Sequence, residues 1–303
     1  MIYTITLNPS IDYVVPVKEL TIGKLNYMEN DLKLPGGKGI NVSRILKEIN
    51  VETTALGFIG GFTGDFISDW LEKDRVKTDF IPIEGDTRIN IKLKSDAETE
   101  INGQGPVITN AEAYQLLTQM ESAESTDTFI LSGSKPPSLP ANYYSKMIEG
   151  ITGKEAEFVI DTTGEALKKA LPYKPLLVKP NQHELEQLFN VQLYTTEDIS
   201  HYGKKLLEAG AKHVIVSLAG DGALLITKDG IYKGINPKGL VKNSVGAGDS
   251  MIAGFVGDYL VSHDPVKAFK MGIASGSATA FSNDLAKKEE ILSLLPQVEV
   301  TSI

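Results

Sequence analysis

The stretch Asn243-Ser244-Val245-Gly246-Ala247-Gly248-Asp249-Ser250 is followed at once by apolar residues at helical spacing, from Met251 to Leu260. Glycines at the start of a helix leave consecutive backbone N–H groups uncovered at its positive end, which favours an anion such as a phosphate. Asp249 would place a second negative charge beside that anion. Its carboxylate therefore either caps the helix, as aspartate often does, or binds a metal ion, or accepts a proton.

A second glycine-rich loop, Pro35-Gly36-Gly37-Lys38-Gly39-Ile40-Asn41, also precedes a predicted helix. It lacks the spacing of a P-loop, and the G-x-G-x-x-G fingerprint of dinucleotide-binding proteins occurs nowhere, which disfavours an NAD-dependent oxidoreductase. Taken alone, the loop is equally explained as a tight turn that needs glycine. Two such loops far apart in the chain favour two anionic or polyhydroxyl ligands, such as the donor and acceptor of a phosphoryl group.

Composition limits the classes of partner. The 303 residues carry a formal net charge of −9, which argues against a nucleic-acid or membrane surface and favours small-molecule partners. The chain has no cysteine, so disulfides and thiolate chemistry are excluded. We see no secretory signal and no apolar run of the ~18 residues that a membrane helix needs. We therefore expect a cytoplasmic protein.

Short β-branched apolar runs alternate with longer segments of helical periodicity along most of the chain. The predicted strands are residues 2–7, 53–59, 128–131, 157–160, 176–178 and 214–217, and the predicted helices are residues 40–49, 64–73, 110–120, 141–151, 181–189 and 199–209. This alternation predicts an α/β fold with a mainly parallel central sheet and helices on both faces. We expect a single domain, residues 1–303.

Two stretches, about residues 13–34 and 87–105, break this pattern because they lack a helix and read as extended segments. They predict a small inserted β-sheet that forms a lid, and such a lid either excludes water or pairs with a second subunit. In open α/β sheets, ligands collect at the carboxyl ends of the strands. The polar residues expected there are Asn8, Ser132, Asp161, Lys179, Asn181 and Ser217.

The two glycine loops, in this order and with this separation, resemble the ribokinase-like (PfkB) family of carbohydrate kinases. The stretches Thr6-Leu7-Asn8-Pro9-Ser10-Ile11-Asp12 and Gly85-Asp86-Thr87-Arg88-Ile89-Asn90 resemble its sugar-phosphate branch. The resemblance covers essentially the whole chain. It implies a ribokinase-like fold, ATP as the phosphoryl donor, Mg²⁺ as the metal ion, and a homodimer formed through the lid.

The resemblance also assigns roles to individual residues. It implies that Asp249 is the catalytic base and that Gly246, Ala247 and Gly248 form the anion hole. The implied residues for the acceptor sugar are Asp12, Gly36, Gly37 and Asn41 at its hydroxyls and Arg88, Lys24, Lys38 and Ser134 at its phosphate. Bidentate phosphate contacts favour arginine, which supports the role of Arg88. We expect the other two arginines, Arg44 and Arg75, on the surface.

The implied nucleotide site is Lys179, Asn181, Ser217, Ala219, Gly220, Gly222, Ser244 and Gly248. Ala219 and Asp221 depart slightly from the family's usual loop. Asn181 and Glu184 lie three apart at a predicted helix start and so share a face. Glu184 is expected to hold Mg²⁺ through water, because hard cations take oxygen ligands.

The leading expectation is an enzyme that phosphorylates the 6-hydroxyl of fructose 1-phosphate. Residues 89–94 and 98–103 look most like the members of the branch that act on this sugar phosphate. One alternative is a tagatose-6-phosphate kinase with the same fold and mechanism. An alternative of another class is a sugar-phosphate-binding regulatory protein without catalysis. Its mark would be loss of Asp249 or of its glycines, and these are intact.

Overall fold

The centre of the main sheet is parallel, as the alternating pattern predicts. In the computed structural model, which describes residues 1–303, the sheet has eleven strands. Its parallel strands are β5 (Lys77–Thr78), β6 (Ile81–Pro82), β4 (Thr53–Ile59), β1 (Ile2–Thr6), β9 (Thr128–Ser132), β10 (Glu157–Asp161), β11 (Leu177–Val178) and β12 (Val214–Ser217). Side chains of β9 and β10 are buried on both faces, which explains their continuous apolar runs.

One edge of the sheet is antiparallel. The chain turns back from β12 into β13 (Ala223–Thr227) and β14 (Gly230–Ile235), and β15 (Glu299–Ser302) completes the edge. The sequence pattern does not predict these three strands. Their antiparallel pairing needs only short connections, so no α-helix separates β12, β13 and β14, and a single 3-10 turn (Ala219–Asp221) joins β12 to β13.

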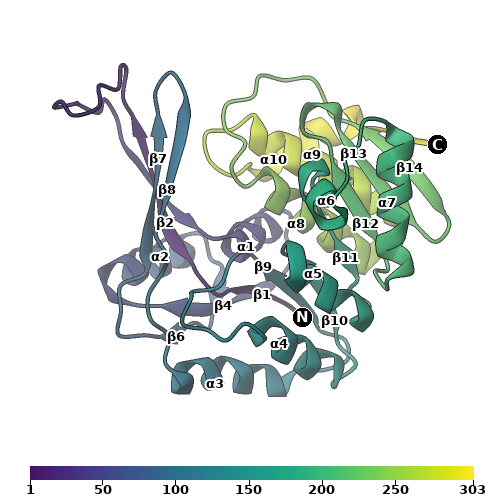
Figure 1. The fold of residues 1–303 in the computed structure, drawn as a ribbon, viewed down its shortest axis with the longest axis horizontal. Helices are drawn as coiled ribbons and strands as arrows, with labels where there is room; N and C mark the ends of the chain where they lie inside the picture. The colour runs from purple at the N-terminus through teal and green to yellow at the C-terminus, as the bar shows by residue number, and fades with distance from the viewer.

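Helices cover both faces of the sheet (Figure 1). One apolar core packs the sheet against α1 (Lys38–Glu48), α8 (Ala247–Ser262), α9 (Pro265–Ala280) and α10 (Lys288–Leu294). The core on the other face involves α3 (Asn110–Gln119), α4 (Tyr143–Thr152), α5 (Gly164–Ala170), α6 (Gln182–Phe189) and α7 (Thr196–Glu208). A smaller cluster holds α2 (Gly61–Lys73) against α1. No helix is both long and apolar enough to span a membrane.

A separate four-stranded sheet stands at one side of the body, with strand order β3-β2-β7-β8 (Figure 1). Its strands are β2 (Ser10–Pro16), β3 (Leu32–Gly36), β7 (Arg88–Lys94) and β8 (Glu98–Asn102). The strand β2 begins at Ser10, ahead of the predicted start near residue 13, so this small sheet includes Asp12 and ends at the glycine loop before α1. The small sheet thus rises from the carboxyl end of β1.

Candidate active site

A polar cavity of about 460 Å³ lies between the small sheet and the carboxyl ends of the parallel strands. Its walls come from both glycine loops and from the predicted strand ends Asn8, Ser132 and Lys179. Of the predicted residues, it brings together Asp12, Gly37, Lys38, Asn41, Arg88, Ser134, Lys179, Gly246, Gly248 and Asp249. A single hydrophobic side chain lines it, which suits a polyhydroxyl ligand more than an apolar one.

Asp249 lies in the first turn of α8 but does not cap it. The N-cap is Gly246, whose φ of 79° is in the left-handed region, and no side-chain capping bond is formed. A Cβ at Gly246 would lie 2.6 Å from Cδ2 of Leu285, so the position requires glycine for both conformation and space. Asp249 is 6% exposed, and its Oδ2 accepts a hydrogen bond from Nδ2 of Asn41 at 2.8 Å. The capping alternative is therefore wrong.

The surroundings of Asp249 favour proton acceptance near neutral pH. Burial and the nearby Asp161 carboxylate raise the pKa of Asp249 to about 6, against the opposing effects of Lys38, Asn41 and Lys179. A carboxylate with a pKa in this range is ionised at pH 7 and is still a better base than an ordinary aspartate. The raised pKa thus suits a group that takes a proton from a hydroxyl.

Asp161, at the end of β10, organises the two lysines of the cavity. Its carboxylate lies 2.7 Å from Nζ of Lys38 and 3.7 Å from Nζ of Lys179. Burial would raise the pKa of Asp161, but the two lysines hold it below its usual value. The sequence places Asp161 at the expected strand end but gives no sign of this pairing, because its partners come from distant parts of the chain.

The small sheet contributes Asp12 and its hydrogen-bond partners. Ser10 Oγ and Asn90 Nδ2 donate to Oδ1 of Asp12 at 2.8 and 3.1 Å. A Cβ at Gly36 would lie 2.5 Å from this carboxylate, so glycine allows the close approach of β3. The sequence motifs assign no role to Asn90. The alternation Arg88-Ile89-Asn90-Ile91-Lys92 nevertheless carries the signal, because alternate residues of a strand share a face.

Arg88 brings a positive charge without a carboxylate partner. Its Nη1 and Nη2 donate to the carbonyl oxygens of Gly103 and Asn8 at 2.8 and 2.9 Å. Its Nε is buried and has no hydrogen-bond partner. A guanidinium held by neutral carbonyls at the cavity wall suits an anionic ligand.

The structure does not bring Lys24 to this cavity. Lys24 is exposed on the segment between β2 and β3, where its N–H bonds the carbonyl of Thr21. The predicted contact with the acceptor phosphate is therefore not formed within this chain, because this segment lies beyond the outer end of the small sheet (Figure 1).

A second cavity, of about 870 Å³, adjoins the first at Gly248, which lines both. It contains most of the predicted nucleotide residues, namely Asn181, Ser217, Ala219, Gly220, Gly222 and Ser244. Apolar side chains such as Met251 and Phe281 form part of its wall. Lys179 lines the first cavity instead, where its Nζ lies 3.1 Å from the Cβ position of Gly248. Two ligand spaces thus meet at the start of α8.

The three predicted anion-hole residues differ in whether their backbone N–H groups are free. The N–H of Ala247 donates to the carbonyl of Ser244 at 3.2 Å, whereas the N–H groups of Gly246 and Gly248 have no backbone acceptor. Two of the three predicted amides are therefore available to an anion at the junction of the cavities.

Asn181 and Glu184 form a reciprocal cap at the start of α6. Oε2 of Glu184 accepts from the N–H of Asn181 at 2.9 Å, and Oδ1 of Asn181 accepts from the N–H of Glu184 at 2.8 Å. No group of three or more acidic, histidine or cysteine side chains could enclose a metal ion. This donor set fits a Mg²⁺ that takes most of its ligands from water and phosphate.

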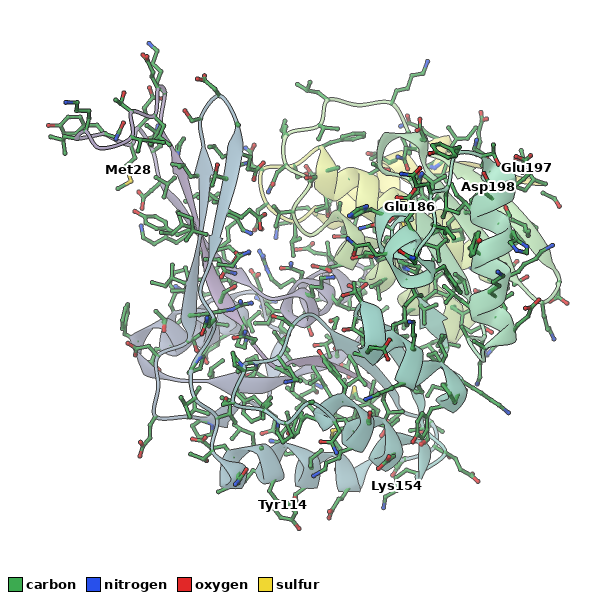
Figure 2. The ribbon with its side chains drawn as sticks, viewed as in Figure 1. Met28, Tyr114, Lys154, Glu186, Glu197 and Asp198 are labelled. Atoms are coloured by element: carbon green, nitrogen blue, oxygen red, sulfur yellow. The ribbon has the colours of Figure 1, made fainter.

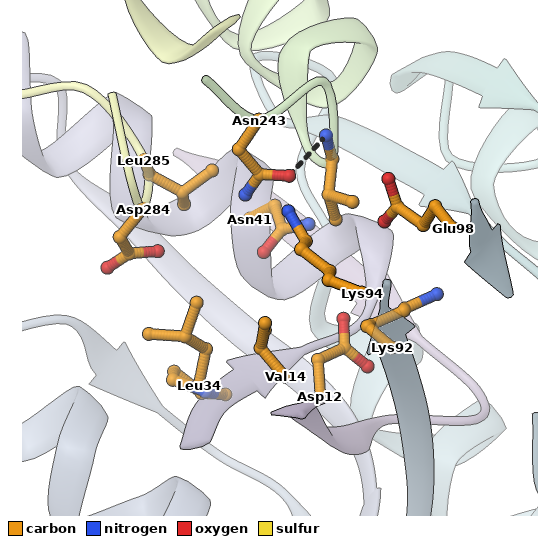
Figure 3. Close-up of a pocket in the computed structure, with 12 residues that line it drawn as sticks. Asp12, Val14, Leu34, Asn41, Lys92, Lys94, Glu98, Asn243, Asp284 and Leu285 are labelled. Atoms are coloured by element: carbon orange, nitrogen blue, oxygen red, sulfur yellow. Dashed lines mark hydrogen bonds between the residues drawn. The ribbon is translucent and has the colours of Figure 1, made fainter. Parts of the chain in front are cut away.

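Arg44 is buried, which corrects the expectation of a surface residue. It is 5% exposed, and its guanidinium bonds both oxygens of Asp284, at 3.1 and 2.5 Å, and Oδ2 of Asp74, at 3.1 Å. Asp284 and Leu285 lie opposite the small sheet across a narrow hollow (Figure 3). Arg44 thus ties α1 to the segment that packs against Gly246. Arg75 is exposed, as expected.

This fold and this pair of adjoining cavities define a carbohydrate kinase of the ribokinase-like class. Residues 5–290 match the pfkB family of carbohydrate kinases, and the chain belongs to that family.

Relatives are similar over the full length. A 1-phosphofructokinase of Bacillus subtilis is 50% identical over 100% of both chains. A D-tagatose-1-phosphate kinase of Bacillus licheniformis is 35% identical over 100% of both chains. The crystal structure of a Staphylococcus aureus protein described as a phosphofructokinase superposes with a TM-score of 0.88 at 45% identity, covering 100% of this chain and 99% of the other.

Proposed function

We propose that this kinase transfers the γ-phosphoryl group of ATP to the 6-hydroxyl of fructose 1-phosphate, giving fructose 1,6-bisphosphate and ADP. The observation that carries the proposal is the place of Asp249. It is a buried carboxylate with a raised pKa in the polar cavity, next to Gly248, which lines both this cavity and the larger, partly apolar one. The similarity to a relative named 1-phosphofructokinase, at 50% identity, supports the choice of acceptor.

In the proposed reaction, Asp249 accepts the proton of the acceptor's 6-hydroxyl. The O6–Pγ bond forms while the bond from Pγ to the β–γ bridging oxygen breaks, and that oxygen leaves with ADP. The free N–H groups of Gly246 and Gly248, with Lys179 beside them, stabilise the charge on the transferring group. Each such donor is worth about 10² to 10³ in rate.

The remaining residues position the two substrates. Asp12, Gly36, Gly37 and Asn41 hold the hydroxyls of the acceptor, while Arg88, Lys38 and Ser134 lie where they can meet its negative charge. The residues of the larger cavity hold the nucleotide. Glu184 would hold Mg²⁺ through water, and the bound ion would supply positive charge that neutralises the phosphates.

A second acceptor is supported by a specific similarity. A relative at 35% identity is named D-tagatose-1-phosphate kinase, whereas the alternative that the sequence offers is tagatose 6-phosphate. A coupled ADP-release assay over fructose 1-phosphate, tagatose 1-phosphate, tagatose 6-phosphate and fructose 6-phosphate decides between these acceptors. We expect the highest kcat/KM for fructose 1-phosphate, and a tenfold preference for any of the others would overturn the proposal. Absence of ADP release with every sugar would instead favour the regulatory alternative.

We also propose that the protein forms a homodimer through the small sheet. The odd-numbered residues of β7 face away from the cavity. Ile89 on β7 and Ile101 on β8, which pairs with Ile91, are 42% and 56% exposed. Met28 lies on the segment at the outer end of the sheet and is also exposed (Figure 2). An apolar sheet face without a covering element favours pairing with a second copy.

A further inference from the structure

Lys92 is a buried lysine at the edge of the acceptor cavity that the mechanism does not use. Its side chain is 8% exposed, and its Nζ lies 2.7 Å from Oε2 of Glu100. Glu100 is the residue directly opposite on β8, and its side chain is 45% exposed. Lysines are rarely buried unless they are paired with an anion. In this structure, the partly exposed carboxylate of Glu100 is the anion paired with Lys92.

The position of Lys92 relates it to the acceptor. Alternate residues of a strand share a face, so Lys92 lies on the same side of β7 as Asn90, whose amide bonds Asp12. In the parallel pairing of β2 with β7, Asp12 is opposite Asn90. Lys92 is two residues further along β7, opposite Val14. Lys92 lines both the acceptor cavity and the adjoining narrow hollow, where it is near Asp12 (Figure 3).

The two cations on this face are held differently. Arg88 rests on carbonyl oxygens of Asn8 and Gly103, which are part of the backbone and stay in place. Lys92 is held by the side chain of Glu100, which a stronger anion can replace. Because the Glu100 side chain is already 45% exposed, the ion pair contributes little free energy to it, and its carboxylate can move into water at small cost.

We propose, resting on the proposed function, that Lys92 binds the phosphate already present on the acceptor sugar and that Glu100 occupies its place when the acceptor is absent. The incoming phosphate takes over the ion pair with Lys92, and Glu100 turns to solvent. A neutral hexose cannot replace the carboxylate. The pair therefore makes the enzyme select phosphorylated acceptors.

The test is steady-state kinetics of the full-length enzyme with fructose 1-phosphate and with fructose as acceptors. Lys92→Met should raise KM for fructose 1-phosphate by at least about tenfold, the effect of losing one charge-assisted hydrogen bond, while KM for ATP changes less than about twofold. The kcat/KM ratio of fructose 1-phosphate over fructose should fall by a similar factor. Glu100→Gln should lower KM for fructose 1-phosphate at least about twofold, because it removes the competing anion.

The control is Lys77→Met, which removes a lysine of an exposed pair with Glu52 on the edge strand β5, outside both cavities. It should leave all constants unchanged. Lys92→Met with an unchanged KM for fructose 1-phosphate would overturn the inference while the proposed function stands. A wild-type enzyme that phosphorylates no sugar phosphate would overturn both. If Lys92→Met does not fold, Glu100→Gln decides, and an unchanged KM would overturn the inference.

Discussion

At the scale of single residues, the account depends on Asp249. Asp249→Asn keeps the size of the side chain and an acceptor for Asn41 but removes the base. We expect turnover to fall at least about 100-fold, the lower range for a general base, while nucleotide binding and folding persist. The matched control is Asp258→Asn, which changes a carboxylate on the same helix that pairs with Lys267 outside both cavities. Retention of wild-type turnover by Asp249→Asn would remove Asp249 from the mechanism.

The raised pKa of Asp249 also predicts a pH dependence. The carboxylate must be ionised to accept a proton, and burial beside Asp161 raises its pKa to about 6. Activity should therefore be full above pH 7 and should fall about tenfold per pH unit well below pH 6. The measurement is kcat/KM from pH 5 to 8, with the coupling enzymes in excess. A profile that stays level down to pH 5 would contradict this assignment.

At the scale of elements, Arg44 joins three segments that are distant in sequence. Arg44→Ala leaves Asp74 and Asp284 without their shared cation and releases the segment that packs against Gly246. Both carboxylates are partly exposed, so water can hydrate them once the cation is gone, and this limits the penalty. We expect the free energy of unfolding to fall by about 2 to 4 kcal/mol. Arg75→Ala, at an exposed arginine, should cost less than about 0.5 kcal/mol. Denaturant unfolding of both variants measures the difference, and equal losses would contradict the role of Arg44.

The sequence predicts elements better than it predicts their partners. Helical and strand periodicity define the βα alternation, and the two glycine loops locate the site, because these signals are local. The burial of Arg44, the bond from Asn90 to Asp12 and the pairing of Asp161 with two lysines depend on contacts between distant segments. For the same reason, a lysine such as Lys24 can be assigned to a phosphate from the sequence and yet lie outside the cavity.

At the scale of the whole molecule, the exposed apolar face of the small sheet predicts self-association. Light scattering at micromolar concentration should give twice the chain mass of 32.8 kDa. Ile101→Glu places a charge on that face and should shift the protein toward monomer. Val261→Glu, at an exposed position of α8, serves as the control and should remain dimeric. A monomeric wild-type protein would contradict the proposed dimer.

The most direct test of the central claim follows the phosphoryl group itself. Phosphorus NMR of the wild-type enzyme with ATP, Mg²⁺ and fructose 1-phosphate separates transfer to sugar from simple hydrolysis of ATP. The account predicts ADP and fructose 1,6-bisphosphate in equal amounts, with no release of inorganic phosphate, and no product with Asp249→Asn on the same timescale. Inorganic phosphate as the main product, or a phosphoryl group on any hydroxyl other than that of carbon 6, would contradict it.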